Sequence, residues 1–121
     1  MTDTTPVIDT EEPADGVIVV TFNEPVITGD EMAMKAAAEI DAVLERDPRA
    51  IVFDFDGVQV INSAMVGKIA AIYKAFKKDG RTLVLCGLGL QLERIFHYTR
   101  LDTVLTIVRD RQDAMEKIDA D

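Results

Sequence analysis

The sequence has few of the features that are typical of secreted or membrane proteins. It contains one cysteine, Cys86, so no disulfide can form within the chain and a reducing compartment is expected. No apolar run approaches the roughly 18 residues that a membrane-spanning helix needs. Residues 1–15, MTDTTPVIDTEEPAD, lack the basic region and apolar core of a secretory signal. We therefore expect a cytoplasmic protein with no membrane insertion.

Positive charge is also scarce. Thirteen Lys and Arg residues stand against 22 Asp and Glu residues, which gives a formal net charge of −9. Nucleic acid binding requires clustered Lys and Arg side chains to neutralise the phosphates. The sequence thus predicts that nucleic acid is not a partner, whereas a basic protein partner is compatible with this charge.

The 121 residues are enough for one domain with a substantial core, and the hydrophobic content of 48% is ordinary for a globular protein. Residues 1–15 carry Thr, Pro, Asp and Glu with few large apolar side chains, so we expect a flexible acidic N-terminal tail. The folded domain is then expected to cover residues 16–121.

Strand and helix patterns alternate along that domain. Strands at 17–22 and 26–27 are predicted to form a hairpin, and Thr28 to Glu31 has the spacing of a capping box for a helix that stops near Asp47. Further strands are expected at 51–55, 58–61, 82–86 and 104–108, with helices from Ser63, around 92–99 and after Asp110. This order predicts an α/β fold: a single domain with a mixed sheet of four to five strands and helices packed mainly on one face.

The stretch from Ile51 to Gly67, IVFDFDGVQVINSAMVG, is the centre of this pattern. An apolar strand breaks at a turn, and Asn62 and Ser63 then favour the start of a helix. Free N–H groups and the helix dipole favour an anion at such a point, so the geometry suits a bound phosphate or a phosphorylated serine. The simpler interpretation is that Ser63 is an N-cap worth about 1 kcal/mol.

Asp54 and Asp56 offer an enzymatic alternative. The run Asp54-Phe55-Asp56-Gly57-Val58 resembles the first motif of the haloacid-dehalogenase phosphohydrolases, which pair two aspartates with a bound magnesium. The context differs, because the next strand ends in Cys86-Gly87 where that family has a serine or threonine. We therefore interpret the two aspartates as a strand end and a turn, and keep the phosphohydrolase as the enzymatic alternative.

His97 and Cys86 are the remaining residues with reactive side chains. His97 is the only histidine and has no cysteine cluster near it in the sequence, so it is predicted to be a surface or half-buried packing residue. Cys86 lies in an apolar run and is predicted to pack as a small hydrophobic side chain. Neither suggests a catalytic or metal site.

From Gly16 to Ile118, the chain resembles a STAS domain of the bacterial anti-sigma-factor antagonist type. The family signature reads approximately Gly-Val-x-x-Ile-Asp-Ser-Ser-Gly-Leu-Gly, and the matching stretch here is GVQVINSAMVG over residues 57–67. Residues 79–87, DGRTLVLCG, resemble the family's Gly-Gly-x-Leu-x-Leu-x-Gly pattern, and Thr99-Arg100-Leu101 its later Thr-Gly-Leu turn. The main departures from the family pattern are Asn62 in place of an aspartate, Ala64 in place of a serine, and Met65 and Arg100 each in place of a glycine. The family also often has an aspartate just before its first helix, where Val26-Ile27-Thr28 stand here.

This resemblance implies a binding protein rather than an enzyme, with no cofactor and no metal. In the family, an anti-sigma factor that is also a serine kinase of the histidine-kinase-like ATPase type phosphorylates the signature serine, and only the unphosphorylated form binds it. Carried across, Ser63 is the phosphorylation site, and Asn62, Ser63, Ala64 and Met65 form the partner-binding surface. The alternative with the same fold is a STAS scaffold or adaptor domain that is not phosphorylated.

Overall fold

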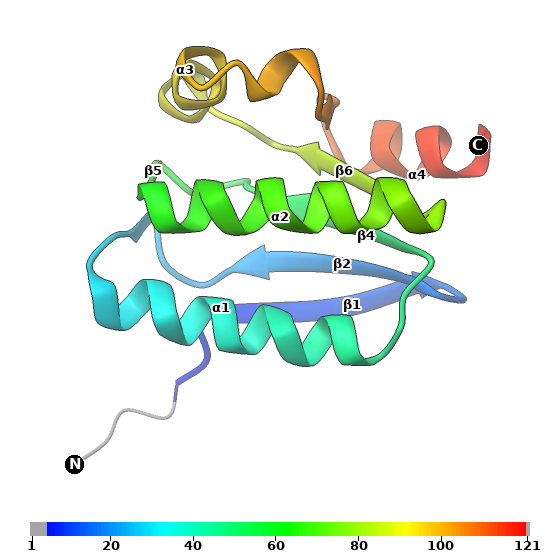
Figure 1. Ribbon diagram of the computed structural model, residues 1–121, viewed down its shortest axis with the longest axis horizontal. Helices are drawn as coiled ribbons and strands as arrows, with labels where there is room; N and C mark the ends of the chain where they lie inside the picture. The colour runs from blue at the N-terminus through cyan, green and yellow to red at the C-terminus, as the bar shows by residue number, and fades with distance from the viewer. Residues whose placement is uncertain (1–4, 121) are drawn as a thin grey trace.

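The computed structural model describes residues 5–120, and Figure 1 shows the arrangement of its elements. In chain order these are β1 (Ile8–Ala14), β2 (Val17–Phe22), β3 (Val26–Ile27), α1 (Asp30–Glu45), β4 (Ala50–Asp54), β5 (Val60–Ile61), α2 (Ser63–Asp79), β6 (Thr82–Cys86), α3 (Leu90–Tyr98), the 3₁₀ turn η1 (Leu101–Thr103), β7 (Thr106–Ile107) and α4 (Arg111–Ala120). None of the helices within residues 5–120 is both long and apolar enough to cross a membrane.

The main sheet has five strands in the order β1-β2-β4-β6-β7. β1 runs antiparallel to β2, and the other neighbours are parallel. The central strand β4 is buried along its whole length, which explains its continuous apolar sequence. The prediction of an α/β domain with a mixed sheet is therefore confirmed.

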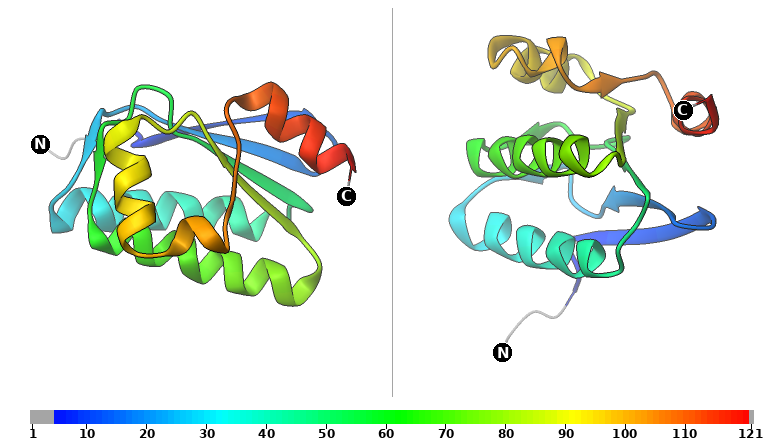
Figure 2. Two further views of the ribbon diagram at one scale, coloured as in Figure 1. Left: turned by 90° about the horizontal axis from the view of Figure 1, so that it is seen from above. Right: turned by 45° about the vertical axis from the view of Figure 1, so that its right-hand side comes forward.

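Helices cover the two faces of the sheet unequally, as Figure 2 shows. Ile51 and Phe53 of β4 point into the larger core, which also contains buried residues of α1, α2 and α3. Ala50 and Val52 point to the opposite face, where Ala114 and Ile118 of α4 complete a smaller core. The alternation along β4 follows from the two-residue period of a strand. The helices are thus packed mainly on one face, as predicted.

The N-terminal segment differs from the prediction. Residues 8–14 were expected to be part of a flexible tail, but they form β1, and residues 1–4 of that tail lie outside the described residues. The backbone N–H of Ile8 donates to the Glu39 carboxylate of α1 at 2.9 Å, and the strand pairs with β2 from Ile8 to Ala14. Its polar composition reflects an edge strand whose side chains largely face solvent, which composition alone does not distinguish from a tail.

The predicted hairpin is also different. β2 pairs with β1 through the turn at Gly16, whereas β3 leaves the main sheet and pairs in parallel with β5. The carbonyl of Pro25 accepts hydrogen bonds from Gln59 N–H at 2.6 Å and Val60 N–H at 3.3 Å, which fixes this second sheet. As a result, the starts of α1 and α2 lie at the same edge of the molecule.

Most predicted helix ends are correct. α1 ends at Glu45, close to Asp47, and Asp110 caps α4 by accepting from Asp113 N–H at 2.9 Å. The capping box at Thr28 and Glu31 is wrong, because the N-cap of α1 is Gly29 and has no side-chain cap. The last strand is shorter than predicted and comprises only Thr106–Ile107.

Candidate functional site

The candidate site is the start of α2, where β5 ends. Here Asn62, rather than Ser63, is the N-cap. Its backbone is extended (φ −91°, ψ 175°), and its Oδ1 accepts a hydrogen bond from Met65 N–H at 3.1 Å. Its own N–H donates to the Ile27 carbonyl at 3.1 Å, so β3 fixes the point at which the helix begins. Both residues are good caps in isolation, and strand pairing selects Asn62.

Ser63 is consequently the first residue of the helix, and its side chain is free for another role. It is exposed, and within residues 5–120 its hydroxyl forms no hydrogen bond. It is also the only serine in the sequence. The interpretation of Ser63 as an N-cap is therefore wrong.

Ala64 is exposed beside Ser63, and both residues belong to the first turn of the helix. The N–H groups of a first turn have no carbonyl partner within their own helix. The surface at this helix end therefore consists of a free hydroxyl, a small side chain and backbone donors.

Met65 does not belong to this surface. Its side chain is 1% exposed and lies in the larger core. The prediction that Met65 contacts a partner directly is wrong, because the residue three positions after the N-cap faces inward once Asn62 sets the start of the helix. The Met65 side chain instead packs in the core, on the inner side of the helix turn that exposes Ser63 and Ala64.

The charges around the two helix starts differ. α2 has no acidic side chain in its first turn, whereas α1 has Asp30 and Glu31. The nearest lysine along α2, Lys68, forms an ion pair with Asp41 of α1. The environment of Ser63 is thus favourable to an anion through the helix dipole alone, with no lysine or arginine in the same turn.

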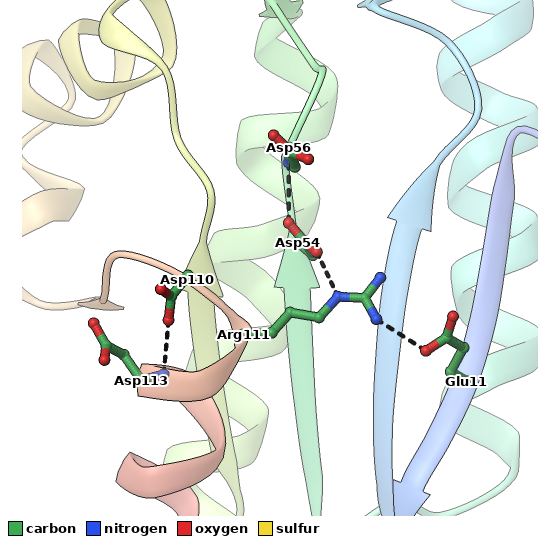
Figure 3. A network of polar contacts seen from close by, with 6 residues as sticks. All are labelled: Glu11, Asp54, Asp56, Asp110, Arg111 and Asp113. Carbon is green, nitrogen blue, oxygen red and sulfur yellow. Dashed lines mark hydrogen bonds and ion pairs between the residues drawn. The ribbon is translucent and has the colours of Figure 1, made fainter.

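Asp54 lies at the end of β4 in a separate network that Figure 3 shows. Its Oδ2 accepts from Arg111 Nε at 2.6 Å, and its Oδ1 accepts from Asp56 N–H at 3.0 Å. Arg111 also donates from Nη1 to Glu11 Oε2 at 2.9 Å. The hydrogen bond to Asp54 raises the pKa of Arg111 above its usual value. This network connects α4 to β4 and to β1.

That geometry gives Asp54 a structural role. Both of its oxygens are engaged, whereas a nucleophilic aspartate needs an oxygen directed at substrate. Residues 5–120 also hold no group of three His, Cys, Asp or Glu side chains arranged to bind a metal ion. The arrangement matches the interpretation of Asp54 and Asp56 as a strand end and a turn.

Cys86 is the last residue of the neighbouring strand β6, and Gly87 follows it. Cys86 is fully buried, and burial, followed by the nearby Asp54, raises the pKa of its thiol to about 12. Its predicted packing role is confirmed. Gly87 has a φ of +72°, and a Cβ atom there would lie 2.7 Å from Asp54 Oδ1. Only glycine fits this position without displacing the Asp54 carboxylate.

His97 is exposed at the surface, as predicted, with 78% of its side chain accessible. Sequence reasoning missed its partner, because Asp102 follows after a turn: the two side chains are 3.0 Å apart between Nδ1 and Oδ2. The five-residue separation spans the end of α3 and the start of η1, where the chain reverses. The pair connects these two short elements.

Comparison with known proteins gives a consistent result. The family model of the STAS domain matches residues 8–114. A search of curated proteins finds no match.

Solved structures are similar over nearly the whole chain. A putative anti-sigma factor antagonist from Thermotoga maritima is 22% identical, with a TM-score of 0.79 over 92% of this chain and 93% of that one. An anti-sigma factor antagonist from Mycobacterium paratuberculosis is 28% identical, with a TM-score of 0.76 and the same two coverages of 92% and 93%. The anti-sigma factor antagonist SpoIIAA in its unphosphorylated form is 11% identical, with a TM-score of 0.77 over 94% of this chain and 97% of that one. SpoIIAA from Bacillus has also been solved in its phosphorylated form.

Proposed function

Because this chain belongs to the STAS domain family, we propose that it is a signalling protein of the anti-sigma-factor antagonist type, switched by phosphorylation of Ser63. The observation that carries the proposal is the exposed Ser63 hydroxyl at the N-terminus of α2, which Asn62 leaves free by capping the helix itself. The similar antagonists from Thermotoga and Mycobacterium support the function, and the phosphorylated form of SpoIIAA supports the type of switch.

The proposed partner is an anti-sigma factor that is also a serine kinase of the histidine-kinase-like ATPase type. It binds the unphosphorylated surface formed by Asn62, Ser63 and Ala64, over the buried Met65. The domain itself is a kinase substrate and catalyses no reaction, and its proposed location is the cytoplasm.

The physical basis of the switch is local. A phosphate adds close to two negative charges at one point of the docking surface. The first turn of α2 contains no lysine or arginine to neutralise them, although the helix N-terminus tolerates the anion within the domain. A partner packed against the bare hydroxyl would have to accommodate an unpaired dianion. A loss of about 4 kcal/mol would weaken a nanomolar complex roughly a thousandfold, without any refolding of the domain.

One observation favours a second candidate, an adaptor domain that docks by the same surface without phosphorylation. Asn62 occupies the position at which the family signature has an aspartate. If that carboxylate is needed by the kinase, the surface would bind its partner constitutively. The phosphohydrolase alternative has no such support, because Arg111 occupies the Asp54 carboxylate.

The sequence makes the test of Ser63 unusually direct. Trypsin releases residues 50–68 as one peptide, in which Ser63 is the only residue with a hydroxyl side chain. The chain would be recovered from its native cells, with and without stress, beside Ser63→Ala. A phosphorylated 50–68 peptide in the wild type establishes the modification. Its absence under every condition favours the adaptor.

Binding is the second part of this test. Wild type, Ser63→Ala and Ser63→Glu would each be immobilised and exposed to a lysate of the same cells, and a captured protein with an ATPase domain of the stated type would be identified by mass spectrometry. We expect wild type and Ser63→Ala to capture it, and Ser63→Glu to capture at least tenfold less. Equal capture by all three variants would contradict the switch.

A further inference from the structure

A cavity of about 450 Å³ lies between α3 and the last strand, β7. The chain leaves α3, reverses through η1 and returns along the edge of the main sheet as β7, and Figure 2 (left) shows α3 in yellow and η1 in orange. Residues of all three elements line the cavity. Its volume is in the range of about 300–1,000 Å³ that is typical of cavities that bind small organic molecules.

The floor of this cavity is apolar and is held in place by the core. Leu105 is only 5% exposed, and Leu88 and Ile107 are partly buried and pack against the larger core. Leu90 stands at the rim, with an exposed fraction of 63%. An apolar group placed on this floor would leave water without any rearrangement of the domain.

Two opposite charges stand at the rim of the same cavity. Glu93 and Arg94 are exposed residues of α3, and both line it. Within residues 5–120, neither side chain forms a hydrogen bond or an ion pair. Other arginines of the chain differ in this respect, because Arg46 pairs with Glu12 and Arg81 pairs with Asp47.

The remaining polar residues at the cavity already have a partner in each other. His97 Nδ1 and Asp102 Oδ2 are 3.0 Å apart, which joins the end of α3 to η1 and closes one end of the cavity. The Asp102 carboxylate is therefore not available to neutralise Arg94. The charged groups left for a ligand are the Glu93 carboxylate and the Arg94 guanidinium.

We propose that this cavity binds a free α-amino acid with a large apolar side chain. The ligand carboxylate accepts hydrogen bonds from Arg94, its ammonium group donates to Glu93, and its side chain covers the floor formed by Leu88, Leu105 and Ile107.

The pair of opposite charges determines the choice of ligand. A simple carboxylate would bind Arg94 but bring its charge close to Glu93, and a simple amine would bind Glu93 but face Arg94. Only a ligand that carries both charges avoids a like-charge contact at this rim. The site uses no residue of the proposed phosphorylation surface, so the inference is independent of the proposed function.

The experiment is an NMR titration of the nitrogen-15-labelled full chain. L-leucine and L-phenylalanine are the probes, and the amide signals of Leu88, Leu105 and Ile107 report binding. Three related compounds each lack one feature: glycine has no apolar side chain, 4-methylpentanoate has no ammonium group, and 3-methylbutylamine has no carboxylate. We expect at least one probe to bind about tenfold or more tightly than each of these three, because each lost contact is worth at least that factor.

Variants locate the two charged contacts. Arg94→Gln and Glu93→Gln should each weaken binding of the amino acid about tenfold or more. Arg109→Gln and Glu116→Gln are the matched controls, because both residues are exposed and lie outside the cavity, and they should bind as wild type does. Glu93→Gln should also bind 4-methylpentanoate more tightly than wild type does, which a merely structural role of Glu93 would not produce.

Three results would overturn the inference. The first is that neither amino acid shifts the reporting signals. The second is that 4-methylpentanoate or 3-methylbutylamine binds wild type as tightly as the amino acids do, because the paired charges would then have no role in recognition. The third is unchanged affinity in both Arg94→Gln and Glu93→Gln, which would place the ligand elsewhere. The dispersion of the amide signals verifies that each variant is folded.

Discussion

Replacing Arg111 with methionine is expected to destabilise the domain by about 2 kcal/mol. The change removes the 2.6 Å hydrogen bond from Arg111 Nε to Asp54 Oδ2 and leaves a carboxylate whose side chain is 10% exposed. Breaking a fully buried ion pair costs about 3–5 kcal/mol. The Arg111 side chain is 41% exposed, so water can reach part of the vacated space. The value expected for a hydrogen bond to a charged group, about 1.5–3 kcal/mol, is therefore more appropriate.

The assay is urea unfolding followed by far-ultraviolet circular dichroism, with a thermal melt in parallel. A loss of about 2 kcal/mol should lower Tm by roughly 6–10 °C in a domain of this size. Arg109→Met is the matched control, because Arg109 is 82% exposed and makes only 3.5 Å contacts with Asp110 and Asp113. It should remain within about 0.5 kcal/mol of wild type.

A double-mutant cycle with Asp54→Asn isolates the interaction itself. The double variant has no buried charge left unpaired, so it should be more stable than the sum of the two single changes predicts, by about 1 kcal/mol or more. The argument would be refuted if Arg111→Met and Arg109→Met were equally stable. It would also be refuted if the stability losses of Arg111→Met and Asp54→Asn simply added up in the double variant. Either result would mean that α4 is held by its apolar contacts alone.

Three further predictions concern single positions. Gly87→Ala should lower the free energy of unfolding by more than about 2 kcal/mol, because its Cβ would lie 2.7 Å from Asp54 Oδ1 in a backbone with φ +72°. Gly67→Ala, whose Cβ would have none of the atoms considered within 4 Å, should instead stabilise α2 by about 0.5–1 kcal/mol. Urea unfolding of both variants would detect these opposite signs. Asn62→Ala should cost about 1 kcal/mol in the same assay through loss of the Met65 N–H bond, and an equal loss in Ser63→Ala would contradict the assignment of Asn62 as the cap. The Cys86 thiol should not react with a disulfide reagent at pH 8 unless urea is added, because its pKa is raised from 9.0 to about 12. The raised pKa means that the folded state holds the thiol proton more tightly than the unfolded state does. The thiol therefore contributes its full stabilisation below about pH 9, and this contribution declines as the pH rises towards 12. Cys86→Ala should remove the thiol's share of the loss of stability between pH 9 and pH 12.

The parts of the fold that the sequence predicts are those with strong local patterns. β2, β4 and β6 are continuous apolar runs because both of their faces are covered, and the long helices carry an inward stripe. β1 has no such pattern, because five of its seven residues are exposed and its order comes from pairing with β2 and from Glu39 of α1. Such tertiary contacts leave little trace in local composition.

The candidate site shows the same division. The position of Ser63 at a helix start follows from local sequence, but the choice of Asn62 as the cap depends on pairing with Ile27 of a distant strand. Because the helix begins after Asn62 rather than one residue later, Met65 faces the core. The contact between Asp54 and Arg111 joins residues 57 positions apart, so no local spacing could have indicated it.

The edge strand β1 has a consequence for how copies of this domain can meet. Its outer side carries backbone groups that could pair with a strand of another molecule. Pro13 has no N–H to offer there, the pairing is irregular between Glu11 and Ala14, and the segment Asp9–Glu12 contains three acidic residues. A second copy laid along this edge would bring like charges together over an interrupted ladder. Continuous growth of the sheet from molecule to molecule is thereby discouraged, and crowded copies of the domain remain separate.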